Sequence, residues 1–324
     1  MEGGHVVSLN NTKEPKILLV DRGGCSFVTK VRNGERAGAS LVVVIDDRFE
    51  DIEEVIMSDD GTGSNVRVPS MIIGKHPGHL LKEFAMTGEP ISLQASFESK
   101  ASRYKVDVEL WYSSNNAQAM DFIAEFSEHA EQLKGVVDFT PRFVSWGCTT
   151  CDTAFKREDC FNDGLYCAPS NVRGGYGSVH GRSILLENIR ESCLYSVLET
   201  KGTEEKWWSY MRHIHSRCSV LKTEACSKNA TETIGESWDE LQKCVNASFG
   251  NPTTAEDAES ENSILAADGD QWKEYGTLFW PSFVINGATF RGNLSHENIL
   301  DAICKAVDTK LQICTELYSI EDLA

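Results

Sequence analysis

The chain of 324 residues has no surplus of positive charge and no long apolar run. It carries 31 Lys and Arg against 49 Asp and Glu, which gives a net charge of −18. Proteins that neutralise nucleic-acid phosphates need a basic face, so this balance argues against nucleic acid as a partner. No stretch approaches the roughly 20 apolar residues that cross a bilayer. The N-terminus, MEGGHVVSLNN, also lacks the apolar region of a signal peptide.

Cysteine is nearly absent from the first hundred residues, where Cys25 stands alone. The segment Cys148-Thr-Thr-Cys151 could supply half of a zinc site, but no second pair stands at ligand spacing, so we expect no metal and no other cofactor. The wide separations instead predict disulfides, which form in oxidising compartments. The ten cysteines are even in number and their pairing stays open. They are Cys148, Cys151, Cys160, Cys167, Cys193, Cys218, Cys226, Cys244, Cys304 and Cys314.

Four N-glycosylation sequons agree with a secretory lumen. They begin at Asn10, Asn229, Asn246 and Asn293. Because the sequence shows no signal peptide, the protein is either cytosolic or an incomplete piece of a longer secretory protein. The ten clustered cysteines favour the second interpretation.

The first hundred residues predict a small α/β module. The run ILLVDRGGCSFVTKVRNGERAGAS gives a strand at Ile17–Val20, a glycine turn and an amphipathic helix. Strands at Leu41–Ile45 and Val68–Ile73 follow, with a polar surface loop over 48–66 between them. A helix near His79–Met86 and a strand near Ile91–Phe97 complete the module. No Ser-His-Asp, metal or phosphate signature accompanies the turn, so the module is interpreted as a binding unit.

The remainder, 101–324, begins and ends with elements in a thioredoxin-like order. A strand at Val106–Tyr112 and a helix at Ala117–Leu133 open it, and a strand, a hairpin and a helix at Leu294–Val307 close it. Ser295 is a plausible N-cap for that last helix. Pro281 stands before the third core strand, where this fold commonly has a cis proline.

Between these parts lies a cysteine-rich insertion over about 147–270 that is mostly helical. Helical periodicity is clear at Ile184–Leu198 and at Trp207–His215. Thr253–Asp270 contains six acidic residues and no basic one, which predicts an exposed loop or linker. The position where an active thioredoxin carries its redox pair has the sequence YSSNNAQA, so the ancestral dithiol is absent.

Several motifs carry a resemblance to known proteins. The DRGGCSF turn, the helix ending in AGA and the strand VPSMII resemble a protease-associated (PA) domain, assigned to residues 1–100 and incomplete at its N-terminus. The segments VELWYSSN, FTPRFVSWGC, GLYCAP, LLENIRESCLYSV and PSFVINGATFRGNL resemble the central lumenal region of plant-type vacuolar sorting receptors. Those receptors continue into EGF-like repeats and a single membrane span, and they carry a cysteine upstream that would be the natural partner of Cys25.

The resemblance implies a cargo receptor without enzymatic activity. Its partners would be soluble cargo proteins, recognised through sorting peptides in the secretory lumen on the route to a vacuole or lysosome-like compartment. The implied contacts are in the RGxCxF-type loop, at Arg22, Gly23 and Gly24, and in a second loop at Met57, Ser58 and Asp59. The guanidinium of Arg22 either faces a peptide or forms an ion pair beside the turn.

Two other functions fit parts of the sequence. A CxxC pair with a low thiol pKa at a helix N-terminus supports disulfide exchange, so Cys148 and Cys151 could serve a disulfide isomerase-like thiol oxidoreductase. A structural disulfide is the competing interpretation, because two further cysteines follow closely. An accessory PA region of a protease is the third possibility, although nothing supplies a catalytic constellation for it.

Overall fold

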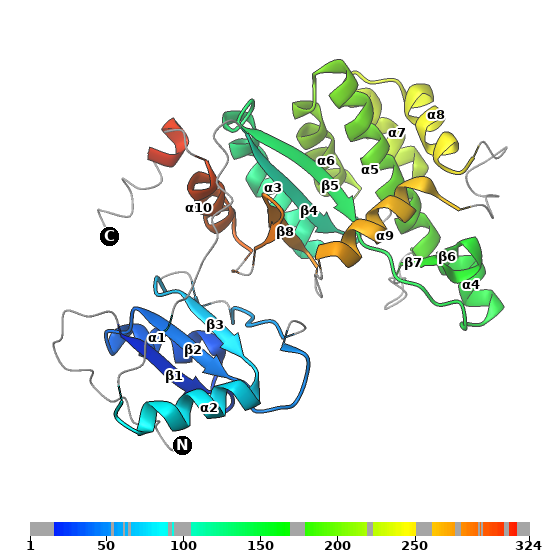
Figure 1. The fold of residues 1–324 in the computed structure, drawn as a ribbon. Helices are drawn as coiled ribbons and strands as arrows, with labels where there is room; N and C mark the ends of the chain where they lie inside the picture. Colours follow the sequence, from blue (N-terminus) through cyan, green and yellow to red (C-terminus); the bar gives the residue numbers. More distant parts are fainter. Residues whose placement is uncertain are drawn as a thin grey trace. The chain divides into compact units, whose positions relative to one another are not determined.

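The structure is a computed structural model. It describes residues 16–315 except 53–54, 61, 64–65, 90–92, 94–104, 169–178, 219–222, 251–260, 276–279, 291, 293 and 308–310. Two compact units divide the chain, the first covering residues 1–99 and the second nearly all of 100–324 (Figure 1). No helix of the described residues combines the length and apolarity needed to cross a membrane.

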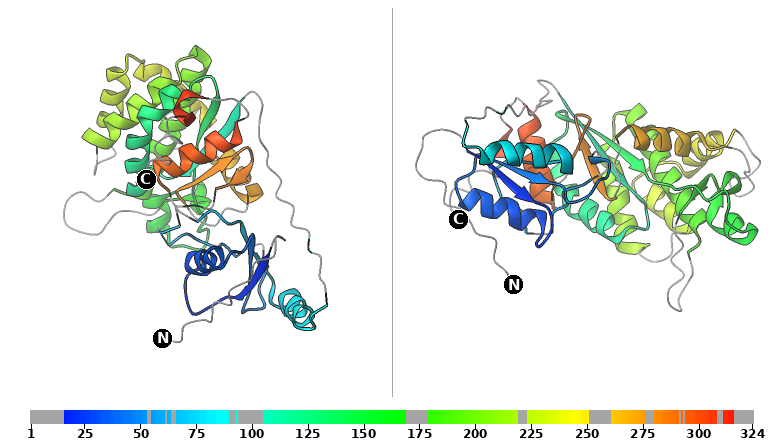
Figure 2. Two further views of the ribbon diagram at one scale, coloured as in Figure 1. Left: turned by 90° about the vertical axis from the view of Figure 1, so that its left-hand side faces the viewer. Right: turned by 60° about the horizontal axis from the view of Figure 1, so that its bottom comes forward.

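The first unit is a three-stranded parallel sheet with a helix on each face (Figure 2). Its strands β1 (Ile17–Asp21), β2 (Leu41–Ile45) and β3 (Ser70–Ile73) stand in that order. The apolar run LVVVI makes β2 the buried central strand, as is usual in a parallel sheet covered on both faces. Helices α1 (Phe27–Arg36) and α2 (Lys75–Met86) cover the two faces. The prediction of an α/β module is confirmed, and the strand expected near 91–97 falls largely outside the described residues.

The second unit is built on a four-stranded sheet of order β5-β4-β8-β9. Strand β4 (Val106–Tyr112) pairs in parallel with β5 (Val137–Phe143) and antiparallel with β8 (Ser282–Ile285). The short β9 (Ala288–Thr289) forms the hairpin with β8. Helix α3 (Ala117–Gln132) connects β4 to β5. This is the predicted thioredoxin-like order.

Two local predictions for the end of this unit are confirmed. The Trp280–Pro281 peptide bond is cis. Helix α10 (His296–Ala306) begins after Ser295, whose side chain accepts a hydrogen bond from the backbone N–H of Asn298. The first prediction came from the thioredoxin-like order of the elements, and the second from a serine before an amphipathic run.

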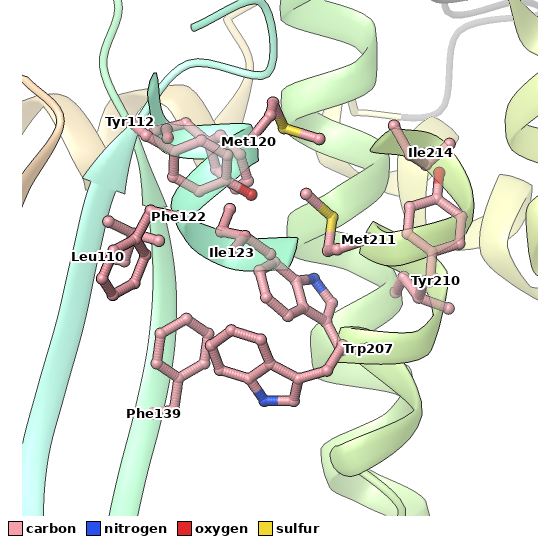
Figure 3. Close-up of a cluster of buried hydrophobic side chains, with 14 of the residues drawn as sticks. Leu110, Tyr112, Met120, Phe122, Ile123, Phe139, Trp207, Tyr210, Met211 and Ile214 are labelled. Atoms are coloured by element: carbon pink, nitrogen blue, oxygen red, sulfur yellow. The ribbon is translucent and has the colours of Figure 1, made fainter. Parts of the chain in front are cut away.

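The inserted segment is helical and packs against one face of the sheet. A two-stranded ribbon, β6 (Cys160–Phe161) with β7 (Tyr166–Cys167), accompanies it, as does the 3₁₀ turn η2 (Asn162–Gly164). The helices are α4 (Thr153–Asp159), α5 (Gly181–Lys201), α6 (Glu205–Arg217), α7 (Glu224–Thr233) and α8 (Trp238–Ser248). Trp207 and Trp208 are both buried, and Figure 3 shows Trp207 beside Phe139 of the sheet. Burial of these rings supplies much of the core, because large aromatic side chains remove the most apolar surface from water.

Each of the ten clustered cysteines lies in a disulfide. The pairs are Cys148–Cys151, Cys160–Cys167, Cys193–Cys244, Cys218–Cys226 and Cys304–Cys314. Cys25 is left as an exposed free thiol.

The prediction of a loop over Thr253–Asp270 is wrong in its second half. Helix α9 (Ser263–Tyr275) begins within it, and Asp268 is buried rather than exposed. Its carboxylate accepts hydrogen bonds from Arg142 and from the backbone N–H of Phe143. Trp272 and Tyr275 of the same helix pack on Trp111, on the sheet face opposite Tyr112. Charge content alone therefore predicted a solvated segment where the chain forms a helix that is paired to β5 through a buried carboxylate.

The glycosylation sequons remain a prediction. Asn229 is exposed on α7, and Asn246 is half-buried on α8. Asn10 and Asn293 lie outside the described residues.

Candidate ligand groove of the first unit

The register of the parallel strands brings Arg22 beside an acidic cluster. Asp21 is the partner of Ile45 in the sheet, so the residues that follow the two strands meet at one edge. The backbone N–H of Arg22 donates to the carbonyl of Ile45 over 2.8 Å. Its guanidinium Nη1 lies 2.8 Å from Asp46 and 2.5 Å from Glu50.

This pairing sets the charge state of the cluster. The side chain of Asp46 is fully buried. Desolvation works to raise its pKa, but the hydrogen bond and charge of Arg22 and the backbone N–H groups of Asp47 and Arg48 outweigh that effect and lower it. The pKa of Arg22 is raised, chiefly by the hydrogen bond to Asp46. Arg22 thus adopts the ion-paired arrangement. Nε lies 3.7 Å from Asp47, so Nη2 is the side-chain nitrogen with neither a hydrogen bond nor an ion pair among the described residues.

The two glycines of the turn are explained by their backbone conformation. Gly23 has a φ of 98° and Gly24 a φ of 78°, a region that L side chains rarely adopt. A Cβ on Gly24 would meet nothing within 4 Å, so the space beside it is open. The turn therefore needs glycine at both positions whether or not a ligand approaches.

A groove of about 390 Å³ lies between α1 and the loop that leads to β3. Most of its lining side chains are apolar, with Ser58, Asp59 and Ser70 as polar members, and polar and apolar atoms contribute nearly equal surface. Its lining residues are Phe27, Val28, Val31, Val55, Ile56, Met57, Ser58, Asp59, Gly63, Val66, Val68, Ser70 and Ile72.

Helix α1 holds the loop in place at three points. The hydroxyl of Ser26, its N-cap, donates to the carboxylate of Asp60 over 2.5 Å. Arg32 donates to the carbonyl and the hydroxyl of Thr62. Glu35 accepts from the backbone N–H groups of Arg67 and Val68. The hydrogen bond from Ser26 is also the largest cause of the lowered pKa of Asp60. A long polar loop thereby becomes one wall of a defined groove.

The predicted cargo residues fall into two neighbouring groups. Met57, Ser58 and Asp59 all line the groove, and Asp59 also accepts a hydrogen bond from the backbone N–H of Gly63 over 3.0 Å. Arg22 and its glycines stand outside the lining. Phe27 connects the two groups, because its ring lines the groove and its centroid lies 5.7 Å from the guanidinium carbon of Arg22.

Sequence reasoning missed the opposite wall. Val28 and Val31 on α1 and Ile72 on β3 contribute apolar surface to the groove. The amphipathic pattern of α1 could have suggested the two valines, which stand three residues apart on one helix face.

The rival pair of cysteines lies elsewhere in the second unit. Cys148 and Cys151 form a half-buried disulfide between β5 and α4. The junction of β4 and α3, where an active thioredoxin carries its dithiol, has Ser113-Ser-Asn-Asn116, and Asn116 caps α3. The described side chains also contain no group of three His, Cys, Asp or Glu that could hold a metal ion.

The chain thus combines a PA-type α/β module that carries a groove with a thioredoxin-like unit whose β4–α3 junction holds no cysteine. Comparison with known families agrees. The PA domain matches residues 4–81, and the vacuolar sorting receptor thioredoxin-like domain matches residues 106–304. The chain therefore belongs to the vacuolar sorting receptor family.

Relatives match along most of this chain. Vacuolar-sorting receptor 5 of Arabidopsis thaliana is 31% identical over 94% of this chain and 52% of its own length. Vacuolar-sorting receptor 1 of Pisum sativum is 29% identical over 91% of this chain and 50% of its own. The chain thus spans about half the length of these curated relatives. Among solved structures, the thiol-disulfide exchange protein alpha-DsbA2 of Wolbachia pipientis has a TM-score of 0.35 at 10% identity over 62% of this chain and 84% of its own.

Proposed function

We propose that this chain is a cargo-binding, non-enzymatic part of a vacuolar sorting receptor in the secretory lumen, and that its first unit binds a peptide segment of soluble cargo. The groove between α1 and the 55–68 loop is the observation that carries the proposal. Family membership gives the receptor role its support, and the groove gives the first unit a place for a ligand.

The lining of the groove suits a short peptide. Phe27, Met57 and Ile72 offer apolar surface for one or two anchoring side chains. The side-chain oxygens of Ser58 and Asp59 can accept hydrogen bonds from backbone N–H groups or from a basic group of the ligand. Arg22 acts beside this groove by holding Asp46 and Glu50 and by packing on Phe27. We therefore propose that it positions this cluster and also contacts the ligand itself, with Nη2 donating to a ligand carbonyl or carboxylate.

The test uses peptides selected on the whole chain. A displayed peptide library is panned on the protein, and the strongest peptide is titrated calorimetrically against the parent and Met57→Ala. We expect Met57→Ala to weaken binding by about tenfold. Met86→Ala is the matched control, because Met86 is 73% exposed on α2 and does not line the groove. Equal affinity of the parent and Met57→Ala for every selected peptide would contradict the proposal that this groove binds the peptide.

A further inference from the structure

A second cavity, of about 230 Å³, opens within the second unit. It lies at the amino ends of β4 and β5, beside Val108 and Val137, and the ends of α5 and α6 close it. The cis Pro281 stands at the other end of the sheet, because the neighbouring Ser282 pairs with Trp111 near the carboxyl end of β4. The cavity is therefore separate from the end where a thioredoxin carries its dithiol.

Aromatic rings form the inner wall of this cavity. The centroid of Phe139 lies 4.7 Å from that of Trp208 and 5.9 Å from that of Tyr195. Phe126 of α3 and Leu133 complete the apolar surface. The faces of such rings carry partial negative charge and attract cations.

Carboxylates outnumber ammonium groups around the same cavity. Lys105 lies 2.5 Å from Asp138, and Lys134 lies 3.1 Å from Glu205. Both lysines of the lining are thus paired with an acid. The pKa of Lys105 is raised chiefly by the hydrogen bond to Asp138 and in part by the charge of Glu204. The lining also includes Glu199.

Glu199 and Glu204 are the acidic members that form no ion pair within the described part of the chain. Oε2 of Glu204 is shielded from solvent and has no hydrogen-bond partner there. A carboxylate oxygen in that state is costly unless a donor reaches it. The acids also act together on Tyr195, whose pKa is raised first by burial and then by the charges of Glu199, Glu204 and Asp138. Their negative field therefore extends across the aromatic wall.

We propose that this cavity binds an arginine side chain presented by a partner polypeptide. A guanidinium can stack on Trp208 or Phe139 while it donates to Glu204, and it gives up its weakly held water more readily than an ammonium does. The volume of about 230 Å³ falls below the roughly 300–1,000 Å³ of pockets for whole small molecules, which favours a single side chain. The site lies apart from the groove of the first unit and does not depend on it.

The test titrates the whole chain with Ac-Gly-Ala-Arg-Ala-Gly-NH₂ and follows indole N–H signals by NMR. Counterpart peptides carry lysine or citrulline in place of arginine. We expect a dissociation constant on the order of 1 mM for the arginine peptide. Affinity should fall at least about tenfold with citrulline, and equally in Glu204→Gln. Glu128→Gln, an exposed change on α3 with the same loss of charge, should bind as the parent does.

Three results would overturn the assignment: equal binding of the citrulline peptide, equal binding of the lysine peptide, or parent-like binding by Glu204→Gln. Glu204 precedes α6 without making a side-chain cap hydrogen bond, so its substitution should leave the helix intact, as circular dichroism can verify. Glu199→Gln removes the other unpaired carboxylate of the cavity, at an exposed position, and its affinity for the arginine peptide is measured in the same way. Met57→Ala should bind the arginine peptide normally, which separates this site from the groove of the first unit.

Discussion

Asp268 and Arg142 form an ion pair between α9 and β5, with Oδ1 of the aspartate 3.2 Å from Nη1 of the arginine. Oδ2 of Asp268 accepts from the backbone N–H of Phe143 over 3.0 Å. Burial nevertheless dominates and raises the pKa of Asp268 to about 6, against the lowering effect of Arg142 and of that amide. The helix that carries Asp268 is thus attached to the sheet through a carboxylate that titrates in mildly acidic solution.

This raised pKa predicts a pH-dependent stability difference between the parent and Asp268→Asn. The pKa of Asp268 in the folded state lies above the unfolded value of about 3.9, so the folded state holds this proton more tightly. The resulting contribution to the free energy of unfolding is complete below pH 4 and is lost as the pH rises through 6. Relative to Asp268→Asn, the parent should lose up to about 3 kcal/mol of unfolding free energy between pH 4 and 7. Urea unfolding followed by tryptophan fluorescence measures it, because all seven tryptophans lie in the second unit.

Asp270→Asn serves as the control for this experiment. Asp270 stands on the same helix with a side chain that is 83% exposed, so its removal changes the net charge equally without touching a buried pair. If the parent and Asp268→Asn lose stability in parallel over this pH range, the raised pKa of Asp268 is contradicted.

Much of the fold could be predicted because local patterns decide it. The alternation of Val106–Tyr112 gave the limits of β4, and a serine before an amphipathic run gave the start of α10. Helix α9 was not predicted because its acidic residues indicated an exposed segment. Asp268 is instead buried against Arg142, which stands 126 residues away in the sequence. Glu187 of α5 is similar, since it is buried and accepts from Tyr210 and Ser227 on other helices.

The candidate site was predictable only in part, for the same reason. Family resemblance placed Met57, Ser58 and Asp59 in a contact loop, and all three line the groove. The ion pair of Arg22 with Glu50 could not be read from sequence, because it depends on the path of the chain after β2. Local spacing says little about where such a segment turns.

Arg22→Ala should destabilise the first unit even without a ligand. It leaves the buried carboxylate of Asp46 without its cation, which costs about 1–3 kcal/mol. Asp46→Asn in the same chain should recover part of that loss, because the double variant buries no unpaired charge. Hydrogen exchange of the β1 and β2 amides, measured by mass spectrometry, reports the stability of this unit. Additive losses of stability in the double variant would contradict the coupling of Arg22 with Asp46. The same measurement shows whether the first unit of Arg22→Ala is folded, which must be known before its peptide binding is compared with that of the parent.

The disulfides should differ in their contribution to stability according to the length of chain they close. Cys193–Cys244 joins residues 51 apart, and Cys148–Cys151 joins residues 3 apart. Loop-closure entropy predicts a cost of about 4 kcal/mol for removing the first and about 2 kcal/mol for the second. Alanine pairs at each site, unfolded in urea and followed by tryptophan fluorescence, provide the comparison. A larger loss from the Cys148–Cys151 pair would show that this short bridge has a structural role beyond chain entropy.

The Cys148–Cys151 disulfide also allows a test between a binding function and a thiol oxidoreductase activity. An active thioredoxin places its dithiol at the junction of the first strand and helix, but here that junction holds Ser113 and Asn116 without a cysteine. Cys148 and Cys151 lie instead beyond β5, with the N–H of Cys148 bonded to the carbonyl of Gly164. We therefore expect no reduction of insulin by the whole chain above the rate of dithiothreitol alone, and the same rate from Cys148→Ser. Turnover by the parent that disappears in Cys148→Ser would instead make this pair a redox centre and would contradict a purely binding role.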